Sequence, residues 1–111
     1  MWLVSSQPDE RRWGPRIEVD FPVRLEFSRG RSAPGRMRNA SISGALIETA
    51  LDLPLHTNLL VILTIPDGNA RSLRGLSACV VRVDVDGVGV EWRDMGSVDI
   101  TDLLARASKG G

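Results

Sequence analysis

The stretch that decides the fold is residues 17–27, which read IEVDFPVRLEF. Apolar residues occupy the odd positions, and charged residues or a proline occupy the even ones. This period of two predicts a β-strand with one buried face. Pro22 has no backbone donor, so we expect an edge position or a bulge at that point in the strand.

Downstream of this stretch, the chain alternates between short apolar segments and turn-forming residues. We expect further strands near 36–38 and at 45–49, 59–65, 71–85 and 88–92. The run at 59–65 is apolar except for Thr64, which predicts a strand buried on both faces. The expected turns lie at 28–35, 39–44, 66–69 and at Asp86-Gly87, where the Asp-Gly pair indicates a two-residue hairpin.

Only the C-terminal end has a helical pattern. Ser97 is expected to be the N-cap, and the spacing of the apolar residues after it predicts one buried stripe. Those residues are Ile100, Leu103, Leu104 and Ala107. We expect Trp92 to pack between this helix and the strands. The pattern predicts an all-β fold, a small six-stranded antiparallel barrel with a C-terminal α-helix, because closing the sheet removes exposed edges.

The length of 111 residues is that of a single domain. We expect a flexible lead-in at 1–11, the folded domain at 12–107 and a tail at 108–111. No apolar run is long enough for a membrane helix, and no signal-peptide pattern is present. The expected location is therefore the cytoplasm, without membrane insertion.

The residue types do not suit an enzyme. Cys79 is the only cysteine and lies in a valine-rich run, so we expect a buried structural thiol. His56 is the only histidine, which leaves no nucleophile–base pair and no multi-histidine metal site. We expect no catalytic residues, no metal and no cofactor.

Charge is unevenly distributed although the net charge is zero. Residues 1–44 carry eight Arg and five acids, whereas residues 45–111 carry six bases and nine acids. A small basic focus on a neutral chain favours a compact anionic ligand over DNA or RNA, which usually meets a broad basic face. Aromatic residues make up only 5%, so stacking platforms for nucleic acid are scarce.

Two short clusters carry the candidate binding chemistry. The first is Arg11-Arg12-Trp-Gly-Pro-Arg16, directly before the first strand, and the second is Asn39-Ala-Ser41-Ile-Ser-Gly44, in an expected turn. Taken singly, each has an ordinary interpretation, as a solvated charge cluster and as a plain turn.

Taken together and in this order, the clusters resemble the PilZ domain, a bacterial receptor module for cyclic di-GMP. Arg12 and Arg16 match its RxxxR motif, with Arg11 as an additional Arg. Asn39, Ser41 and Gly44 match its [D/N]xSxxG motif, and residues 87–92 (GVGVEW) are similar to its last strand. The resemblance covers about residues 10–105 and implies a PilZ-like split barrel.

The resemblance implies a role for each motif residue. Arg11, Arg12 and Arg16 would bind guanine and phosphate, because guanidinium forks meet the O6 and N7 acceptors of guanine bidentately and stack on bases. Asn39 and Ser41 would accept hydrogen bonds from the other guanine, and Gly44 would permit a backbone angle or a close approach. The additional Arg11 allows two stacked ligand molecules.

The expected function is a sensor or adaptor in which cyclic di-GMP orders the N-terminal Arg segment onto the barrel. This ordering would change the surface that a protein partner contacts. A partner is expected because no output domain is seen in the sequence. The alternative is a PilZ-fold protein-interaction module that does not bind cyclic di-GMP. The intact motif residues favour the sensor.

Overall fold

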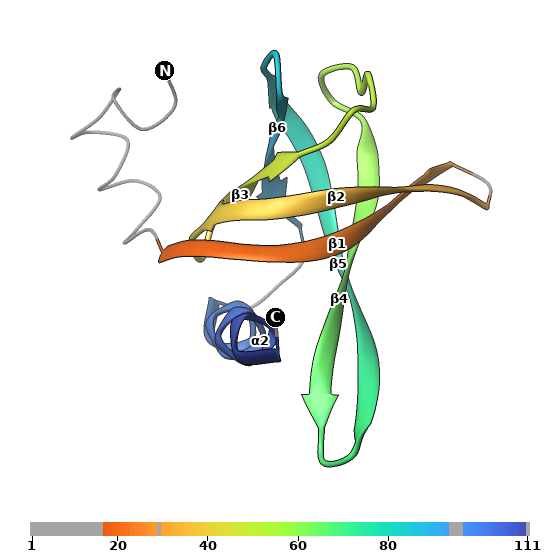
Figure 1. The fold of residues 1–111 in the computed structure, drawn as a ribbon. Coiled ribbons are helices and arrows are strands. Elements are labelled where there is room, and N and C mark those ends of the chain that lie inside the picture. The colour runs from red at the N-terminus through yellow and green to blue at the C-terminus, as the bar shows by residue number, and fades with distance from the viewer. Residues whose placement is uncertain (1–16, 29, 94–96, 111) are drawn as a thin grey trace.

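The computed structural model describes residues 17–28, 30–93 and 97–110. Within them, six strands form a closed antiparallel barrel in the order β1-β2-β3-β6-β5-β4, with one helix beside it (Figure 1). The elements are β1 Ile17–Ser28, β2 Arg31–Ala40, β3 Gly44–Glu48, β4 Asn58–Asp67, β5 Ala70–Val83, β6 Gly87–Trp92 and α2 Ser97–Gly110. The predicted barrel with a C-terminal helix is confirmed.

Strand β1 follows the alternation of its sequence. Val19, Phe21, Val23 and Leu25 are at most 7% exposed, while the charged residues between them face solvent. A register shift between Glu18 and Phe21 precedes Pro22, and Pro22 lies outside the Arg24–Glu26 segment that pairs with β4. The predicted bulge or edge position of this proline is thus confirmed.

Strand β2 is longer than the sequence predicted. The expected turn over 28–35 is wrong, because residues 31–35 pair with β1 and only the few residues around Gly30, with φ of 68°, reverse the chain. Pro34 pairs with β1 on one side, and β3 pairs with β2 only from Arg36 onward. The side of β2 that faces β3 therefore has no strand partner at Pro34 in the described structure, so the missing N–H of proline is tolerated. Asn39 and Ala40 also belong to β2 rather than to the turn.

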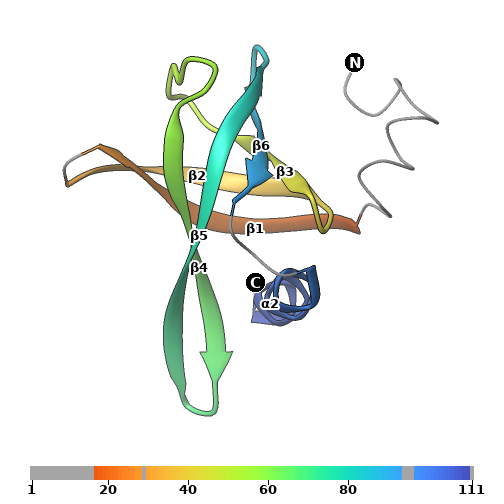
Figure 2. The ribbon, with the colours of Figure 1, turned by 180° about the vertical axis from the view of Figure 1, so that it is seen from behind.

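Strands β4 and β5 form a long hairpin that extends beyond the barrel wall (Figures 1 and 2). The prediction that 59–65 is buried on both faces is wrong. Leu59, Val61, Leu63 and Ile65 are buried, whereas the intervening residues are half-buried or exposed. The reason is that one face of the hairpin covers the core and α2, while the other has no second layer over it among the described residues.

The β5–β6 connection differs by one position from the expected Asp86-Gly87 hairpin. Asp84 N–H donates to Gly87 O at 2.8 Å, so the two-residue loop is Val85-Asp86 and Gly87 opens β6. A Cβ on Gly87 would lie 2.1 Å from Ile47 O. Glycine is therefore required here for a close approach of two strands rather than for the turn.

Helix α2 closes the core on the side of β4. Ile100, Leu104 and Ala107 are at most 2% exposed, and Leu103 packs partly buried against the same cluster. The predicted apolar stripe is confirmed, and Trp92 belongs to the same buried cluster. No helix in the described part of the chain is long and apolar enough to cross a membrane.

Candidate functional site

The site predicted from the second motif is the hairpin turn between β2 and β3. Ser41 N–H donates to Gly44 O at 2.8 Å, which closes a two-residue loop of Ile42 and Ser43. The hydroxyl of Ser41 accepts a bond from Ser43 N–H at 3.2 Å and stabilises the loop from inside. Ser41 and Gly44 are therefore brought together in one loop, and Asn39 lies two residues before Ser41, near the end of β2.

Asn39 lies at the inner rim of this turn. It pairs with Glu18 on β1 and with Leu46 on β3, and a register shift between Met37 and Asn39 marks a bulge just before it. Its side chain is only 5% exposed, and its Oδ1 is buried with no hydrogen-bond partner among the described residues. An unpaired buried acceptor is rare and costs about 1–3 kcal/mol, so it indicates a position held for something other than stability.

Ser41 and Gly44 have more limited binding capacity than their motif roles imply. One lone pair of Ser41 Oγ is used by Ser43 N–H, which leaves the hydroxyl proton and a second lone pair for a ligand. Gly44 pairs with Glu91 and does not have a positive φ, which in the described residues occurs only at Gly30, His56 and Gly68. Of its two expected roles, a special backbone angle is therefore wrong, and a close approach stays a prediction.

Trp92 stabilises the turn through two hydrogen bonds, a role that the sequence analysis did not predict. Its indole Nε1–H donates to Ser41 O at 3.0 Å, and its backbone N–H donates to Ser43 O at 2.9 Å. The side chain is 9% exposed. No local signal could reveal these bonds, because Trp92 and Ser41 are 51 residues apart in sequence and meet only through the pairing of β3 with β6.

The chain enters the barrel beside this turn. Ile17, the first residue of β1, pairs with Ala40, the last residue of β2. Arg16 directly precedes Ile17 in the sequence. The side chains of Arg11, Arg12 and Arg16 lie outside the described residues, as does the expected lead-in at 1–11.

The outer wall next to the turn carries paired charges. Arg36 Nε donates to Asp20 Oδ1, and Arg38 Nη1 donates to Glu48 Oε2 at 3.0 Å. The hydrogen bond from Arg36 lowers the pKa of Asp20 below its ordinary value, with further help from the charges of Arg36 and Arg38. Both arginines therefore already have carboxylate partners, and this wall offers little positive charge to an anion.

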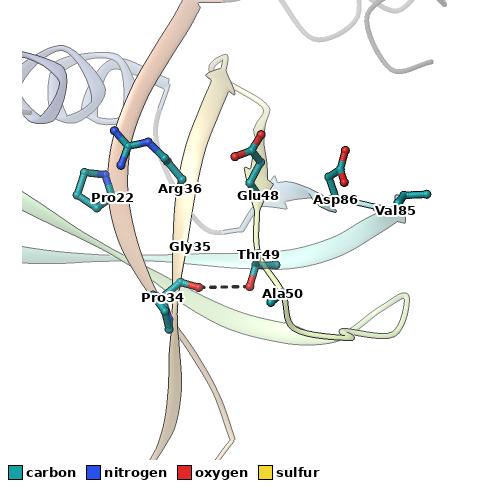
Figure 3. A pocket seen from close by; sticks show the side chains of 9 residues that line it. All are labelled: Pro22, Pro34, Gly35, Arg36, Glu48, Thr49, Ala50, Val85 and Asp86. Atoms are coloured by element: carbon teal, nitrogen blue, oxygen red, sulfur yellow. Dashed lines mark hydrogen bonds between the residues drawn. The ribbon is translucent and has the colours of Figure 1, made fainter.

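A hollow lies at the end of β3 that is far from the β2–β3 turn (Figure 3). It has a volume of about 850 Å³ and is lined by Pro22, Pro34, Gly35, Arg36, Glu48, Thr49, Ala50, Val85 and Asp86. It contains none of the predicted binding residues. Its charged lining residues are Arg36, Glu48 and Asp86. Arg36 is paired with Asp20 and Glu48 with Arg38, so the lining residues supply no unpaired cation for a phosphate ligand.

A family model described as PilZ domain matches residues 10–107. The crystal structure of the PilZ domain of CeSA from a cellulose-synthesizing bacterium is similar to 87% of this chain and 97% of that chain, with a TM-score of 0.63 and 19% sequence identity. No curated protein matches the sequence.

Proposed function

Because the chain belongs to the PilZ domain family, which includes receptors for cyclic di-GMP, we propose that it is a non-catalytic cyclic di-GMP sensor that acts through a protein partner. The ligand site is formed by Arg11, Arg12 and Arg16 together with the β2–β3 turn. The family itself is one of binding modules rather than enzymes.

The observation that carries this proposal is the Oδ1 of Asn39, which is buried and has no hydrogen-bond partner among the residues that the structure describes. A buried acceptor without a donor is unfavourable in the free protein and becomes favourable when a ligand supplies the donor. Guanine N1–H and N2–H groups are donors of the right kind for an amide oxygen and for the free lone pair of Ser41. A small movement of the turn is needed to expose Asn39 Oδ1, since that atom is buried.

The charge of the ligand has to be matched by the N-terminal segment. Cyclic di-GMP carries two phosphates, and Arg36 and Arg38 on the neighbouring wall are already paired with carboxylates. The proposal therefore assigns this task to Arg11, Arg12 and Arg16. Their guanidinium groups suit both phosphate and the O6 and N7 edge of guanine.

The register of β1 supports a mechanism of segment ordering. Because Ile17 pairs with Ala40, residues 11–16 need to fold back over only a short distance to cover a ligand on the turn. Ordering of this segment around the ligand changes the surface next to the turn. A partner protein can then distinguish the bound from the free state through differential contacts.

Isothermal titration of the full chain with cyclic di-GMP tests the proposal. We expect saturable binding, with affinity reduced at least about tenfold in Arg12→Ala and in Arg16→Ala because each loses a charge-assisted bond worth about 1.5–3 kcal/mol. A stoichiometry near two that falls in Arg11→Ala indicates stacked ligands. Arg71→Ala, on the distant β4–β5 hairpin, is the matched control and leaves binding unchanged.

A folded chain that gives no binding heat, with cyclic di-GMP present well above micromolar concentrations, contradicts the sensor function. That result favours the alternative of a PilZ-fold protein-interaction module. Equal affinity in the wild type and in Arg12→Ala and Arg16→Ala would show that the ligand binds somewhere other than the proposed site.

A further inference from the structure

The β4–β5 hairpin exposes a strand edge. Strand β5 pairs with β4 from Ala70 to Cys79, but it pairs with β6 only from Ala78 onward. Over residues 70–76 its second edge has no strand partner in the described structure, and at Ser77 only the backbone oxygen accepts a bond, from Arg93 N–H at 2.8 Å. In Figures 1 and 2, β4 is the strand next to α2, and β5 is the outer strand of the hairpin.

This edge lacks most of the features that prevent pairing with another strand. No proline lies within residues 70–77, and the pairing of β4 with β5 has no register shift that would bend the edge away. Leu73, in the middle of the segment, is 71% exposed. Its only charged neighbours on the segment are Arg71 and Arg74, so any strand added here has to accommodate two cations.

We propose that this edge pairs with the same edge of a second copy of the chain, antiparallel and centred on Leu73. Antiparallel pairing about a two-fold axis places Leu73 opposite the partner subunit's Leu73 and covers both exposed side chains. Arg71 then lies opposite the partner's Gly75, where no side chain opposes it. Ser72 lies opposite the partner subunit's Arg74.

Other two-fold registers are less favourable. Centring the pair on Arg71 or on Arg74 places two like charges directly opposite each other, which destabilises a strand pair. Centring it on Ser72 places Leu73 opposite the partner's Arg71, so the two leucines no longer cover each other. If the pair were centred between two residues, a residue on the outer face of one hairpin would lie opposite a residue on the inner face of the other. The outer faces of the two hairpins would then lie on opposite sides of the joined sheet.

Charge complementarity supports the register centred on Leu73. Ser72 Oγ donates to the carboxylate of Asp67 at 3.3 Å, so this acid leans toward Ser72. The partner's Arg74, opposite Ser72, is within side-chain reach of that carboxylate. The two-fold axis creates the same ion pair twice, which offsets the repulsion of the arginines gathered at the edge.

Disulfide trapping tests the register directly. In a Cys79→Ala background, which removes the one natural thiol, Leu73→Cys is expected to form an intermolecular disulfide under mild oxidation. Directly opposed residues have Cα atoms about 4.5–5.5 Å apart, within disulfide range. Thr64→Cys is the matched control, because Thr64 pairs with Leu73 on the same face but lies one strand away from the axis. It is expected to form no cross-link.

Sedimentation equilibrium tests the association without cysteines. We expect a concentration-dependent dimer, with Kd raised at least about tenfold in Leu73→Glu because the two carboxylates oppose each other. Arg74→Asp and Asp67→Arg are each expected to weaken the dimer, and their combination to restore it. Leu55→Glu, at a 51% exposed site outside the hairpin, is the control and has no effect.

A chain that stays monomeric up to millimolar concentration overturns the proposal, even if a peptide from another protein binds the edge. Equal cross-linking of Leu73→Cys and Thr64→Cys overturns it as well, since the dimer then uses another surface. Cyclic di-GMP plays no part in these measurements, so their outcome is independent of the proposed ligand site.

Discussion

Asn39 combines a cost in stability with a proposed role in binding. Its Oδ1 is buried without a partner in the described structure, so replacing the amide by an apolar side chain of similar shape removes an unfavourable group. We predict that Asn39→Leu raises the free energy of unfolding by about 1–3 kcal/mol while it weakens cyclic di-GMP binding. Urea denaturation and calorimetric titration measure the two effects.

Asn39→Asp is the matched variant for this prediction, because it keeps an acceptor in the motif position and is expected to retain binding. Lower stability of Asn39→Leu together with unchanged affinity would contradict the proposed role, since it would mean that the amide is a structural group.

Gly87 is required by the close approach of β6 to β3. A Cβ at this position would lie 2.1 Å from Ile47 O and 2.8 Å from Glu48 Cα, and both are backbone atoms that can move only with their strand. We predict that Gly87→Ala lowers the free energy of unfolding by roughly 3 kcal/mol or more. Thermal or chemical denaturation provides the measurement.

Gly75→Ala is the control for the Gly87 prediction. Its Cβ would lie 3.6 Å from Leu60 Cδ2, an ordinary contact, so we expect stability to stay unchanged or to rise by about 0.4–1 kcal/mol. Similar losses in both variants would refute the argument from close approach.

Asp20 gives the outer wall a pH dependence. Hydrogen bonding to Arg36 holds the pKa of Asp20 below the ordinary value of 3.8. A carboxyl with a lowered folded-state pKa contributes stability above the unfolded value and loses it as the pH falls through the folded pKa. Because the pair is exposed, the contribution is small and screened by salt.

We predict that NMR titration finds the Asp20 carboxyl mostly ionised at the pH at which a free aspartate is half-protonated. Arg36→Gln is expected to move the pKa of Asp20 back toward 3.8. An Asp20 titration that does not respond to Arg36→Gln would contradict the assigned cause.

At the scale of elements, the turn between β2 and β3 is held by a residue on β6. Trp92 Nε1–H donates to Ser41 O at 3.0 Å, and phenylalanine cannot make this bond. We predict that Trp92→Phe costs about 1–3 kcal/mol, because a buried carbonyl loses its donor, and that it weakens ligand binding by loosening the turn. Denaturation and titration of the same sample check both effects. Unchanged affinity despite lower stability would contradict the prediction that the order of the turn contributes to ligand binding.

The elements that the sequence predicted well are those with a strong local period. The alternation in β1 and the apolar stripe of α2 directly reflect which face is buried. The start of β2 was missed because Ser28–Gly35 has the composition of a turn, and only its pairing with β1 makes it a strand. Likewise, the apolar run in β4 does not reveal that its hairpin leaves the barrel and exposes one face.

The candidate site was predictable only in part, for a similar reason. The motif spacing predicted a turn that contains Ser41 and Gly44, and the hydrogen bonds of the loop confirm it, whereas Asn39 belongs to β2 just before the loop. The burial of Asn39 and the bonds from Trp92 depend on pairings between distant segments, which no local pattern encodes. The roles of Arg11, Arg12 and Arg16 stay predictions.

At the scale of the whole molecule, ligand binding and stability are linked. A ligand that binds only the folded chain adds about 2.7 kcal/mol of stability at a concentration of 100 times Kd. For a domain of this size we predict that saturating cyclic di-GMP raises Tm by roughly 10 °C. Differential scanning calorimetry measures the shift, and GMP at the same concentration is the control. A Tm that does not change on adding saturating cyclic di-GMP would contradict specific binding to the folded state.

The measurement that most directly tests binding at the turn is a ¹H–¹⁵N NMR titration of the full chain with cyclic di-GMP. We predict saturable shifts concentrated at Ile17, at the amides of residues 41–44 and at the indole of Trp92, with the hollow around Thr49 and Asp86 unaffected. The absence of shifts, or shifts confined to that hollow, would contradict a cyclic di-GMP site at the β2–β3 turn.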